Sequence, residues 1–228
     1  MATLSSDAQT VELKEEKKKT VNLGAQRKSY LVAKRMLDIV ISVVGLIIMC
    51  VPMIVIAVLI KLETPGPAIY IHNRIGKNGK ELPLLKFRSM FINADDLIDS
   101  FTPEQKAEWK KYFKLKKDPR ITRIGDFLRK SSLDELPQLI NVLKGELSIV
   151  GPRPIVTEEL ERYGEEKSKF LSVTPGLTGY WQAYARSTCS YEERMEMELY
   201  YVDNASFWWD IKIIFATFLG VIRGRGAR

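Results

Sequence analysis

The longest apolar run in the sequence, Ile39 to Ile60, constrains the fold more than any other feature. It reads "IVISVVGLIIMCVPMIVIAVLI" and holds 22 residues without a charge. As a helix, this run would be about 33 Å long, which is enough to cross the hydrocarbon core of a bilayer. It begins too late and is too long for a typical signal peptide, and no small-residue cleavage site follows it. A membrane segment is therefore expected.

Pro52 and the charges around the run leave two arrangements open. Proline removes a backbone donor and clashes with the preceding turn, so Pro52 divides the run into pieces of 13 and 8 residues. Eight Lys or Arg residues lie between positions 14 and 35, and six between positions 61 and 88, whereas a simple span has a clear charge asymmetry. A helix that enters, breaks at Pro52 and returns to the same face satisfies both observations. A single kinked span is the alternative.

Composition narrows the chemistry that the chain can perform. The net charge of +7 predicts an anionic partner such as nucleic acid, acidic lipid or a phosphorylated substrate. Two cysteines and a single histidine, His72, argue against a disulfide framework, a histidine metal site and a Ser-His-Asp triad. No RNA-binding motif, helix-turn-helix signature or zinc spacing supports nucleic acid. Carboxylates and cations must then carry the chemistry.

The chain divides into three parts. Residues 1–33 are too polar to join a core and are expected to form a mobile arm, residues 34–62 hold the membrane helix, and residues 63–228 form one domain. Gly and Pro residues predict a hairpin or short strands over residues 64–90. Residues 93–115 are rich in helix formers, with a break at Thr102 and Pro103.

The stretch "SFWWDIKIIFATFLGVIRGRG" near the C-terminus combines two tryptophans, a short apolar segment and arginines. This composition suits a helix that lies at a membrane interface. An ordinary core helix with a basic tail is the alternative.

Two adjacent acids, Asp134 and Glu135, lie where two amphipathic helices are predicted to meet. Apolar residues at helical spacing before and after the pair predict these helices. Ser132 with Glu135 fits a capping box, while Pro137 favours a helix that starts slightly later. Either register places the acids at or beside a helix N-terminus. Taken alone, they are helix caps.

Cations in segments framed by Gly and Pro change that interpretation. Arg129 precedes Asp134 by five residues, and Arg153 stands between two prolines in "GPRP". Further cations are Lys86 and Arg88 in "KFRSM" and Arg186 in "YARS". An acid amid arginines that can grip phosphate oxygens bidentately is typical of phosphoryl transfer with a carboxylate nucleophile. A solvated charged face is the alternative.

Several longer motifs carry a family resemblance. In order, they are "KRMLDIVIS", "GPAIYIHNRIGKNGK", "LLKFRSM", "DPRITRIGDFLRKSSLDELPQLINVLKGELSIVGPRP", "TPGLTGYWQ" and "LYYVDNASFWWDIKI". From about Lys34 to the C-terminus, the chain resembles the bacterial sugar transferases, the monotopic phosphoglycosyl transferases. The resemblance implies an α+β, mainly helical fold with a re-entrant helix-break-helix segment, a compact cytoplasmic catalytic domain and interfacial amphipathic helices. We expect the small catalytic-core form, without the multi-span extension of larger members.

The resemblance also implies a reaction. The family transfers a sugar 1-phosphate from a UDP-sugar to polyprenol (undecaprenyl) phosphate and releases UMP. This step initiates a membrane-linked glycan, such as exopolysaccharide, capsule, O-antigen or a glycoprotein glycan, at the cytoplasmic face of the bacterial inner membrane. Asp134 corresponds to the nucleophile, which forms a phosphosugar-aspartyl intermediate, and Glu135 corresponds to its partner.

Cofactor and partners follow from the same resemblance. Mg²⁺ is expected, with Asp134 as a ligand. Phosphate-binding roles are expected for Arg129, Arg153, Lys86, Arg88 and Arg186. Ala185 stands where many members have glycine, which bears on the loop that holds Arg186.

Membrane lipids are further partners, nucleic acid is not expected, and downstream glycosyltransferases or a homo-oligomer are compatible with the sequence. The alternative is a noncatalytic basic, membrane-anchored binding or scaffold protein of a glycan assembly complex. The motifs do not name the sugar.

Overall fold

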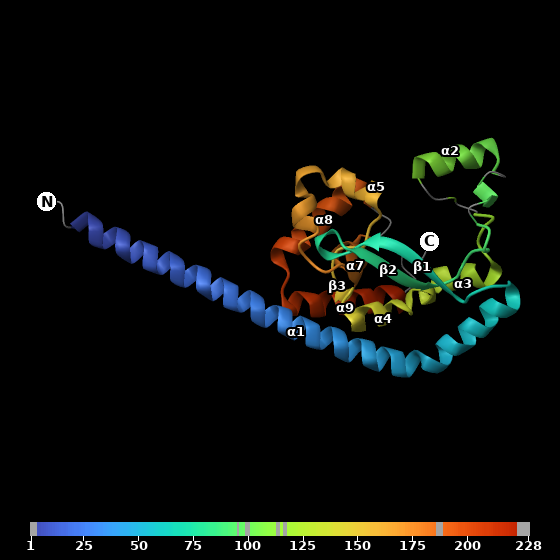
Figure 1. The fold of residues 1–228 in the computed structure, drawn as a ribbon, viewed down its shortest axis with the longest axis horizontal. Helices are drawn as coiled ribbons and strands as arrows, with labels where there is room; N and C mark the ends of the chain where they lie inside the picture. Colours follow the sequence, from blue (N-terminus) through green and yellow to red (C-terminus); the bar gives the residue numbers. More distant parts are fainter. Residues whose placement is uncertain are drawn as a thin grey trace.

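The computed structural model describes residues 4–94, 96–98, 101–112, 115, 118–185 and 189–222. Within these ranges the chain is mainly helical, with two small sheets of two strands each (Figure 1). The α+β, mainly helical class predicted from the sequence is confirmed. Arg186 lies outside the described residues.

Helix α1 (Leu4–Glu63) is a single long helix that contains Pro52. The helix bends in the light blue to cyan part of the ribbon, and its last part runs upward along the right-hand end of the body (Figure 1). The break predicted at Pro52 is thus a bend within a continuous helix, because a proline removes one hydrogen bond while residues on both sides stay helical. The Arg27–Glu63 part of α1 is long and apolar enough to cross a membrane, and 11% of its most apolar stretch is buried.

The predicted hairpin is confirmed. Strand β1 (Ile69–Ile75) pairs antiparallel with β2 (Glu81–Phe87), and Ile69 lies opposite Phe87. A single 3₁₀ turn, η1 (Lys77–Gly79), joins them, and Asn78 within it has a φ of 58°. Leu82, Leu84 and Phe87 of β2 are buried, so this strand faces the core.

The helix-rich stretch after the hairpin contains η2 (Asp96–Ile98) and α2 (Pro103–Tyr112) among the described residues. Thr102 marks the predicted break: its hydroxyl accepts a hydrogen bond from the Gln105 backbone N at 3.2 Å, and its own N donates to Gln105 Oε1 at 2.9 Å. In Figure 1, α2 stands apart from the rest of the body.

Helix α3 (Arg123–Ser131), the 3₁₀ turn η3 (Leu133–Glu135) and α4 (Gln138–Lys144) follow. Thr122 caps α3 by accepting a hydrogen bond from the Gly125 N at 2.9 Å. The predicted capping box at Ser132 is wrong, because Ser132 adopts a left-handed conformation (φ 58°) that ends α3. The later start favoured by Pro137 is confirmed, since Pro137 immediately precedes α4.

The remaining elements surround a short parallel sheet. Strand β3 (Ser148–Val150) pairs with β4 (Gly176–Thr178). Between and after these strands lie α5 (Thr157–Leu160), η4 (Glu161–Glu166), α6 (Lys167–Phe170), α7 (Tyr180–Tyr184), α8 (Tyr191–Asn204) and α9 (Phe207–Ile222). The backbones after β3 and around β4 are in close contact: a Cβ at Gly176 would lie 2.1 Å from the Gly151 N.

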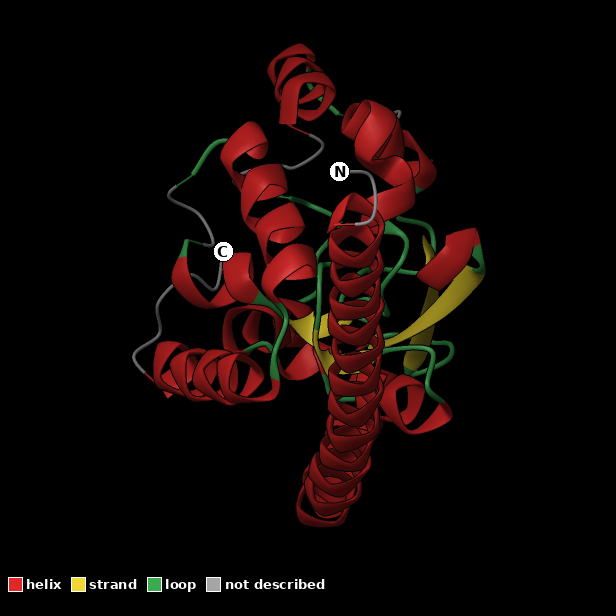
Figure 2. Ribbon diagram, turned by 90° about the vertical axis from the view of Figure 1, so that its left-hand side faces the viewer, coloured by secondary structure: helices red, strands yellow, loops and turns green. Residues whose placement is uncertain are grey.

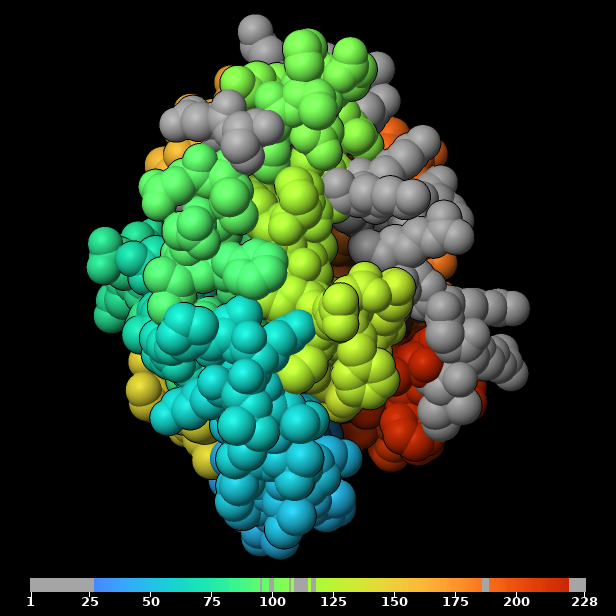
Figure 3. All heavy atoms as spheres, turned by 90° about the vertical axis from the view of Figure 1, so that its right-hand side faces the viewer, coloured from blue at the N-terminus to red at the C-terminus, as the bar shows by residue number. Residues whose placement is uncertain are grey.

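Both limbs of α1 pack against the same body. Ile41 and Leu46 contact the main core cluster, and Ile56 and Ile60 belong to a second cluster with Phe87. Figure 2 looks along α1, with the strands behind it and other helices on both sides. In the space-filling view of Figure 3, the blue to cyan part of α1 is the lowest protrusion of the molecule. The part of α1 that makes these contacts therefore underlies the body, whereas the N-terminal part of the helix projects away from it (Figure 1).

Candidate active site

The acid pair lies in η3, between two helices that are anchored in different parts of the core. Leu133 and Leu136 pack against the cluster that holds Leu128, and Leu139 belongs to the main cluster. The left-handed turn at Ser132 allows the chain to change direction directly before the acids. Apolar contacts on both sides thus fix the position of η3.

Asp134 is 9% exposed. Burial raises the pKa of its carboxyl group to about 6, and the neighbouring charge of Glu135 acts in the same direction. The cations Lys86 and Arg129 oppose this rise. A carboxylate with a raised pKa, between another acid and two cations, has the electrostatic environment of many catalytic groups.

Glu135 points to the hairpin. Its Oε1 lies 2.9 Å from the Nζ of Lys86 on β2, and both side chains are partly exposed. Asp134, in contrast, forms no ion pair with any side chain in the described part of the chain. The two acids therefore have different environments: Glu135 is paired with a lysine, whereas Asp134 is buried without an ion-pair partner among the described residues.

A shallow hollow that is open to solvent lies beside Glu135. Its lining comes from the hairpin, α4, the segment after β3, β4 and α7: Arg74, Leu84, Lys86, Glu135, Gln138, Arg153, Pro154, Gly176, Leu177 and Gln182. Three cations against one acid make this hollow positive, which suits a ligand with several negative charges.

Arg153 reaches the hollow from a rigid loop. Its backbone N donates to Glu198 Oε1 at 3.2 Å. The Gly151 N donates to the Thr178 O at 2.8 Å, and the Gly176 N donates to the Pro152 O at 2.8 Å. These bonds hold the "GPRP" loop against β4, so the backbone position from which Arg153 extends is fixed.

The other cations predicted to bind phosphate do not all lie at the hollow. Lys86 lines the hollow beside Arg153. Arg129 lies close enough to Asp134 to affect its pKa, and its Nε donates to Ser89 Oγ at 2.8 Å. Arg88 is buried and donates to the carbonyl oxygens of residues 64 and 65, at 2.9 and 2.7 Å. The structure thus brings Lys86, Arg129 and Arg153 to the acids and uses Arg88 to hold the end of α1.

Residues 29–224 match the family model described as "Bacterial sugar transferase". The chain belongs to the bacterial sugar transferase family. The match includes η3, the hollow and the apolar part of α1.

Relatives of this sugar transferase are found in several bacteria. An undecaprenyl-phosphate galactose phosphotransferase of Salmonella typhimurium is 47% identical over 90% of this chain and 43% of the relative. An exopolysaccharide production protein of Sinorhizobium fredii is 42% identical over 90% of this chain and 92% of the relative. A UDP-glucose:undecaprenyl-phosphate glucose-1-phosphate transferase of Escherichia coli is 38% identical over 81% and 39%, respectively. The chain thus spans less than half the length of the Salmonella and Escherichia relatives.

Sequence reasoning missed three residues of this sugar transferase site. Arg74, Gln138 and Gln182 all line the hollow. Each stands in a motif that carries the family resemblance, "HNRIG", "DELPQL" or "TGYWQ". Their places within those motifs were the available signal, but the amides of Gln138 and Gln182 are uncharged and have no reactivity that marks them in a sequence, and Arg74 was not distinguished from the other cations.

Proposed function

We propose that the chain transfers a sugar 1-phosphate from a UDP-sugar to polyprenol phosphate and so initiates a membrane-linked glycan. The observation that carries this proposal is the buried Asp134 beside the Glu135–Lys86 pair, at the edge of a hollow lined by cations. The printed names of the Salmonella and Escherichia relatives point to the same chemistry.

The reaction has two displacements at one phosphorus atom. A carboxylate oxygen of Asp134 attacks the phosphorus that bears the sugar, the bond from that phosphorus to the UMP oxygen breaks, and UMP leaves with the electron pair. An oxygen of polyprenol phosphate then attacks the same phosphorus and breaks its bond to Asp134. The carboxylate is regenerated, and the sugar is linked to the polyprenol through a diphosphate.

The surrounding side chains stabilise the charge that builds up in this process. Arg153 can contact phosphate oxygens with two nitrogens at once. Lys86 neutralises Glu135 and faces the same hollow. Arg129 lies near Asp134 and favours its ionised form. These three cations are therefore proposed to hold the diphosphate.

Asp134 is also proposed to hold Mg²⁺. No group of three or more His, Cys, Asp or Glu side chains that could hold a metal occurs among the described residues. Mg²⁺ usually takes one or two carboxylates and completes its shell with substrate phosphates and water, so the adjacent acids Asp134 and Glu135 fit it. Such an ion supplies charge neutralisation at the diphosphate.

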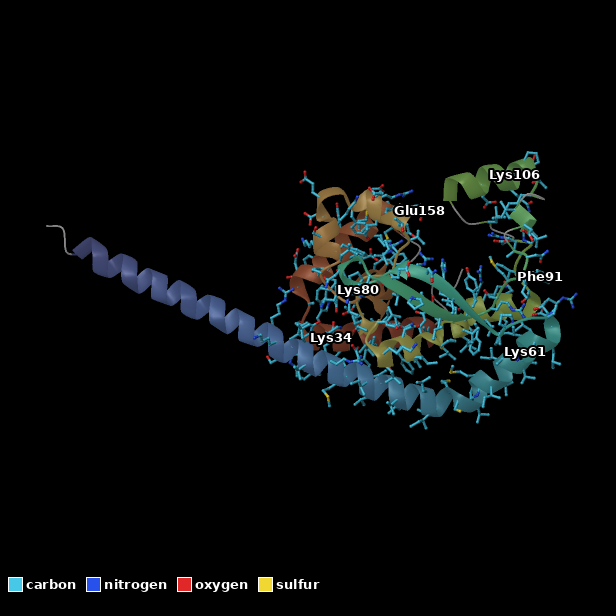
Figure 4. All side chains as sticks on the ribbon, viewed as in Figure 1. Lys34, Lys61, Lys80, Phe91, Lys106 and Glu158 are labelled. Atoms are coloured by element: carbon cyan, nitrogen blue, oxygen red, sulfur yellow. The ribbon has the colours of Figure 1, made fainter. Side chains whose placement is uncertain are left out.

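The membrane helix is proposed to enter and leave by one face. Before the apolar run, Lys34 Nζ donates to the Val150 O at 2.7 Å, and Asp38 Oδ1 accepts from the Ile149 N at 2.8 Å. After the run, Glu63 Oε1 accepts from the Arg123 N at 2.8 Å. Figure 4 shows Lys34 and Lys61 on the two limbs, both along the same side of the body. A straight span would carry these ends about 30 Å apart, to opposite sides of a bilayer.

Exposed apolar side chains support this placement. The outer surface of α1 presents valines, isoleucines and leucines between its two tethered ends. On α9, Trp208, Phe215, Phe218 and Leu219 are exposed. Surfaces of this kind are unfavourable in water and favourable in lipid. We propose that they seat the enzyme on the cytoplasmic face of the bacterial inner membrane, where polyprenol phosphate is reached from the lipid.

Impermeant maleimide labelling tests the topology. Lys28→Cys and Lys80→Cys are exposed sites on the two sides of the apolar run, and each is introduced into a variant in which Cys50 and Cys189 are alanine. Both cysteines should react only after the inner membrane is permeabilised. Labelling of one site in intact spheroplasts and of the other only after permeabilisation would contradict re-entry.

UMP release tests the reaction. Purified protein is incubated with Mg²⁺, polyprenol phosphate and a panel of UDP-sugars, and one donor should yield UMP and a polyprenol diphosphate sugar. Without polyprenol phosphate, up to one equivalent of UMP should appear, and the sugar-phosphate mass should lie on a peptide with Asp134. Absence of UMP with every donor would favour the noncatalytic scaffold instead.

A further inference from the structure

Three residues that line the hollow each have one buried polar atom without a hydrogen-bond partner among the described residues. These atoms are Arg74 Nε, Gln138 Nε2 and Gln182 Oε1. Native proteins satisfy about nine in ten of their buried polar groups, and leaving one without a bond costs free energy. Three such atoms, in residues of β1, α4 and α7 that line a single hollow, therefore indicate groups that are satisfied by a ligand.

The contrast within α4 strengthens this interpretation. Asn141, one turn after Gln138, is also buried, but its amide is fully used. Its Oδ1 accepts from the Leu85 N at 3.0 Å, and its Nδ2 donates to the Pro83 O at 2.9 Å and to Glu146 Oε2 at 2.7 Å. Gln138 is 2% exposed, yet its Nε2 makes no such bond. One amide holds the fold together, and the other faces the hollow.

We propose that Gln138, Gln182 and Arg74 recognise the hydroxyl groups of the sugar in the donor. This inference rests on the proposed function. Gln138 and Gln182 both carry an amide, which offers a donor and an acceptor. A phosphate oxygen can serve only donors, whereas a hydroxyl group both donates and accepts and so matches an amide.

The in-line geometry of phosphoryl transfer indicates which part of the donor these three side chains contact: the sugar, and not the nucleotide. In phosphoryl transfer, the attacking and leaving oxygens lie roughly in line on opposite sides of phosphorus. UMP, the leaving group, is then on the far side of the phosphorus from Asp134, whereas the sugar oxygen is equatorial. Gln138 follows Asp134 by four residues and lines the same hollow as Glu135. The groups beside the nucleophile therefore face the sugar.

Equilibrium binding in the Asp134→Asn background tests the subsite without turnover. The affinity for UDP-galactose, UDP-glucose and UDP is measured by titration calorimetry in this background, alone and combined with Gln138→Met or Gln182→Met. Methionine keeps the length of the side chain and removes its hydrogen bonds. The sugar nucleotide that wild type turns over should bind about five- to tenfold more weakly to each double variant, because one hydrogen bond is lost and its hydroxyl partner is left unpaired. UDP should bind unchanged.

Two controls separate a ligand-binding role from a structural one. Gln105→Met alters an amide on α2 that is bonded to Thr102 N and does not line the hollow, so donor affinity should not change. Asn141→Leu removes bonds within the fold and should lower the unfolding temperature, whereas Gln138→Met removes none and should leave it unchanged.

Three results would overturn the inference: unchanged donor affinity in both methionine variants, an equal loss for UDP and the sugar nucleotide, or a fall in the unfolding temperature of Gln138→Met comparable to that of Asn141→Leu. If the variants lose as much affinity for UDP as for the sugar nucleotide, the two amides bind the nucleotide and not the sugar. Failure of wild type to release UMP from any donor would overturn the proposed function, and the subsite with it.

Discussion

Two buried polar regions of this molecule use similar side chains in opposite ways. Where α1 meets α8, α9 and β3, Asp210 is 1% exposed and accepts hydrogen bonds from Lys34 at 2.9 Å, Tyr30 at 3.0 Å and Tyr201 at 2.7 Å. Next to Glu135, which lines the hollow, Asp134 is also buried, but no described side chain forms an ion pair with it.

This difference in partners indicates different roles for the two buried carboxylates. A buried charge whose partners come from the protein ties elements together, and removal of one partner leaves a costly unpaired charge. A buried acid without such partners destabilises the folded chain, which is typical of groups in active sites. The first region should therefore respond to mutation in stability, and the second in activity.

Asp134→Asn should have the largest effect. Asparagine keeps the size of the side chain and is a good helix cap, but its amide cannot form an acyl phosphate, so UMP release should fall by a factor of about 10³ or more, which corresponds to about 4 kcal/mol in the barrier. Mass spectrometry should find no sugar-phosphate on the peptide. Asp210→Asn is the matched control: its folded fraction should still acquire the label. An active Asp134→Asn enzyme would remove the distinction between the two regions.

Lys34→Met should have the largest effect on stability. It leaves the Asp210 carboxylate buried without its cation, which costs about 3 kcal/mol or more. The midpoint of urea unfolding in detergent, followed by tryptophan fluorescence, measures this loss. Lys130→Met breaks an exposed pair with Asp126 and should cost less than about 0.5 kcal/mol. Equal midpoints for the two variants would contradict the role of the junction.

The pH dependence of stability should reveal the cost of burying Asp134. Its pKa in the folded protein is about 6, against an ordinary value of 3.8, so the folded state binds a proton more readily than the unfolded state. Stability should therefore fall as pH rises from about 4 to 6, by up to about 3 kcal/mol at 1.36 kcal/mol per pH unit. With EDTA present, Asp134→Asn should be more stable than wild type at pH 7.5, and this advantage should vanish near pH 3.5. A constant difference across this range would count against the raised pKa.

Arg153→Lys should have a smaller effect on activity. Lysine keeps the charge but loses the planar pair of donors, so kcat/KM for the donor should fall about 10- to 100-fold, or about 1.4 to 2.7 kcal/mol. The unfolding temperature should not change. In Arg88→Lys, where the guanidinium holds backbone carbonyls, stability should fall more than kcat/KM. The reverse pattern would exchange the roles assigned to the two arginines.

Much of this organisation could be predicted because it is local. Alternating Gly and Pro punctuation predicted the hairpin, and helical spacing predicted α3 and α4 on either side of the acids. The placement of Asp134, Glu135 and Arg153 followed from motifs in which these residues lie close together in sequence. The proximity of Lys86 to Glu135 requires the hairpin to fold onto η3, and the sequence did not predict this contact.

The remaining features depend on tertiary contacts. The left-handed conformation of Ser132 is set by the packing of Leu133 and Leu136 on both sides of η3, which outweighs the capping-box pattern. Pro52 bends α1 without ending it, because Met53 and Ile56 beyond it pack as a helix against the second core cluster. Charge alone could not separate Arg88, which is buried on carbonyls, from Arg153, which lines the hollow. A phosphate-binding role for Arg88 and for Arg186 stays a prediction.

The close backbone contact at Gly151 and Gly176 limits how this enzyme can vary. A Cβ at Gly151 would lie 2.6 Å from the Thr174 O, and one at Gly179 would lie 2.2 Å from the Gly151 O, so even alanine at these positions would separate the two loops that aim Arg153. In a saturation mutagenesis library selected for glycan production, these glycines should tolerate as little change as the acids, although they carry no reactive group. A map of the positions that do not tolerate substitution would therefore mark these glycines, which hold the loops beside the candidate site, as strongly as the acids of the site itself.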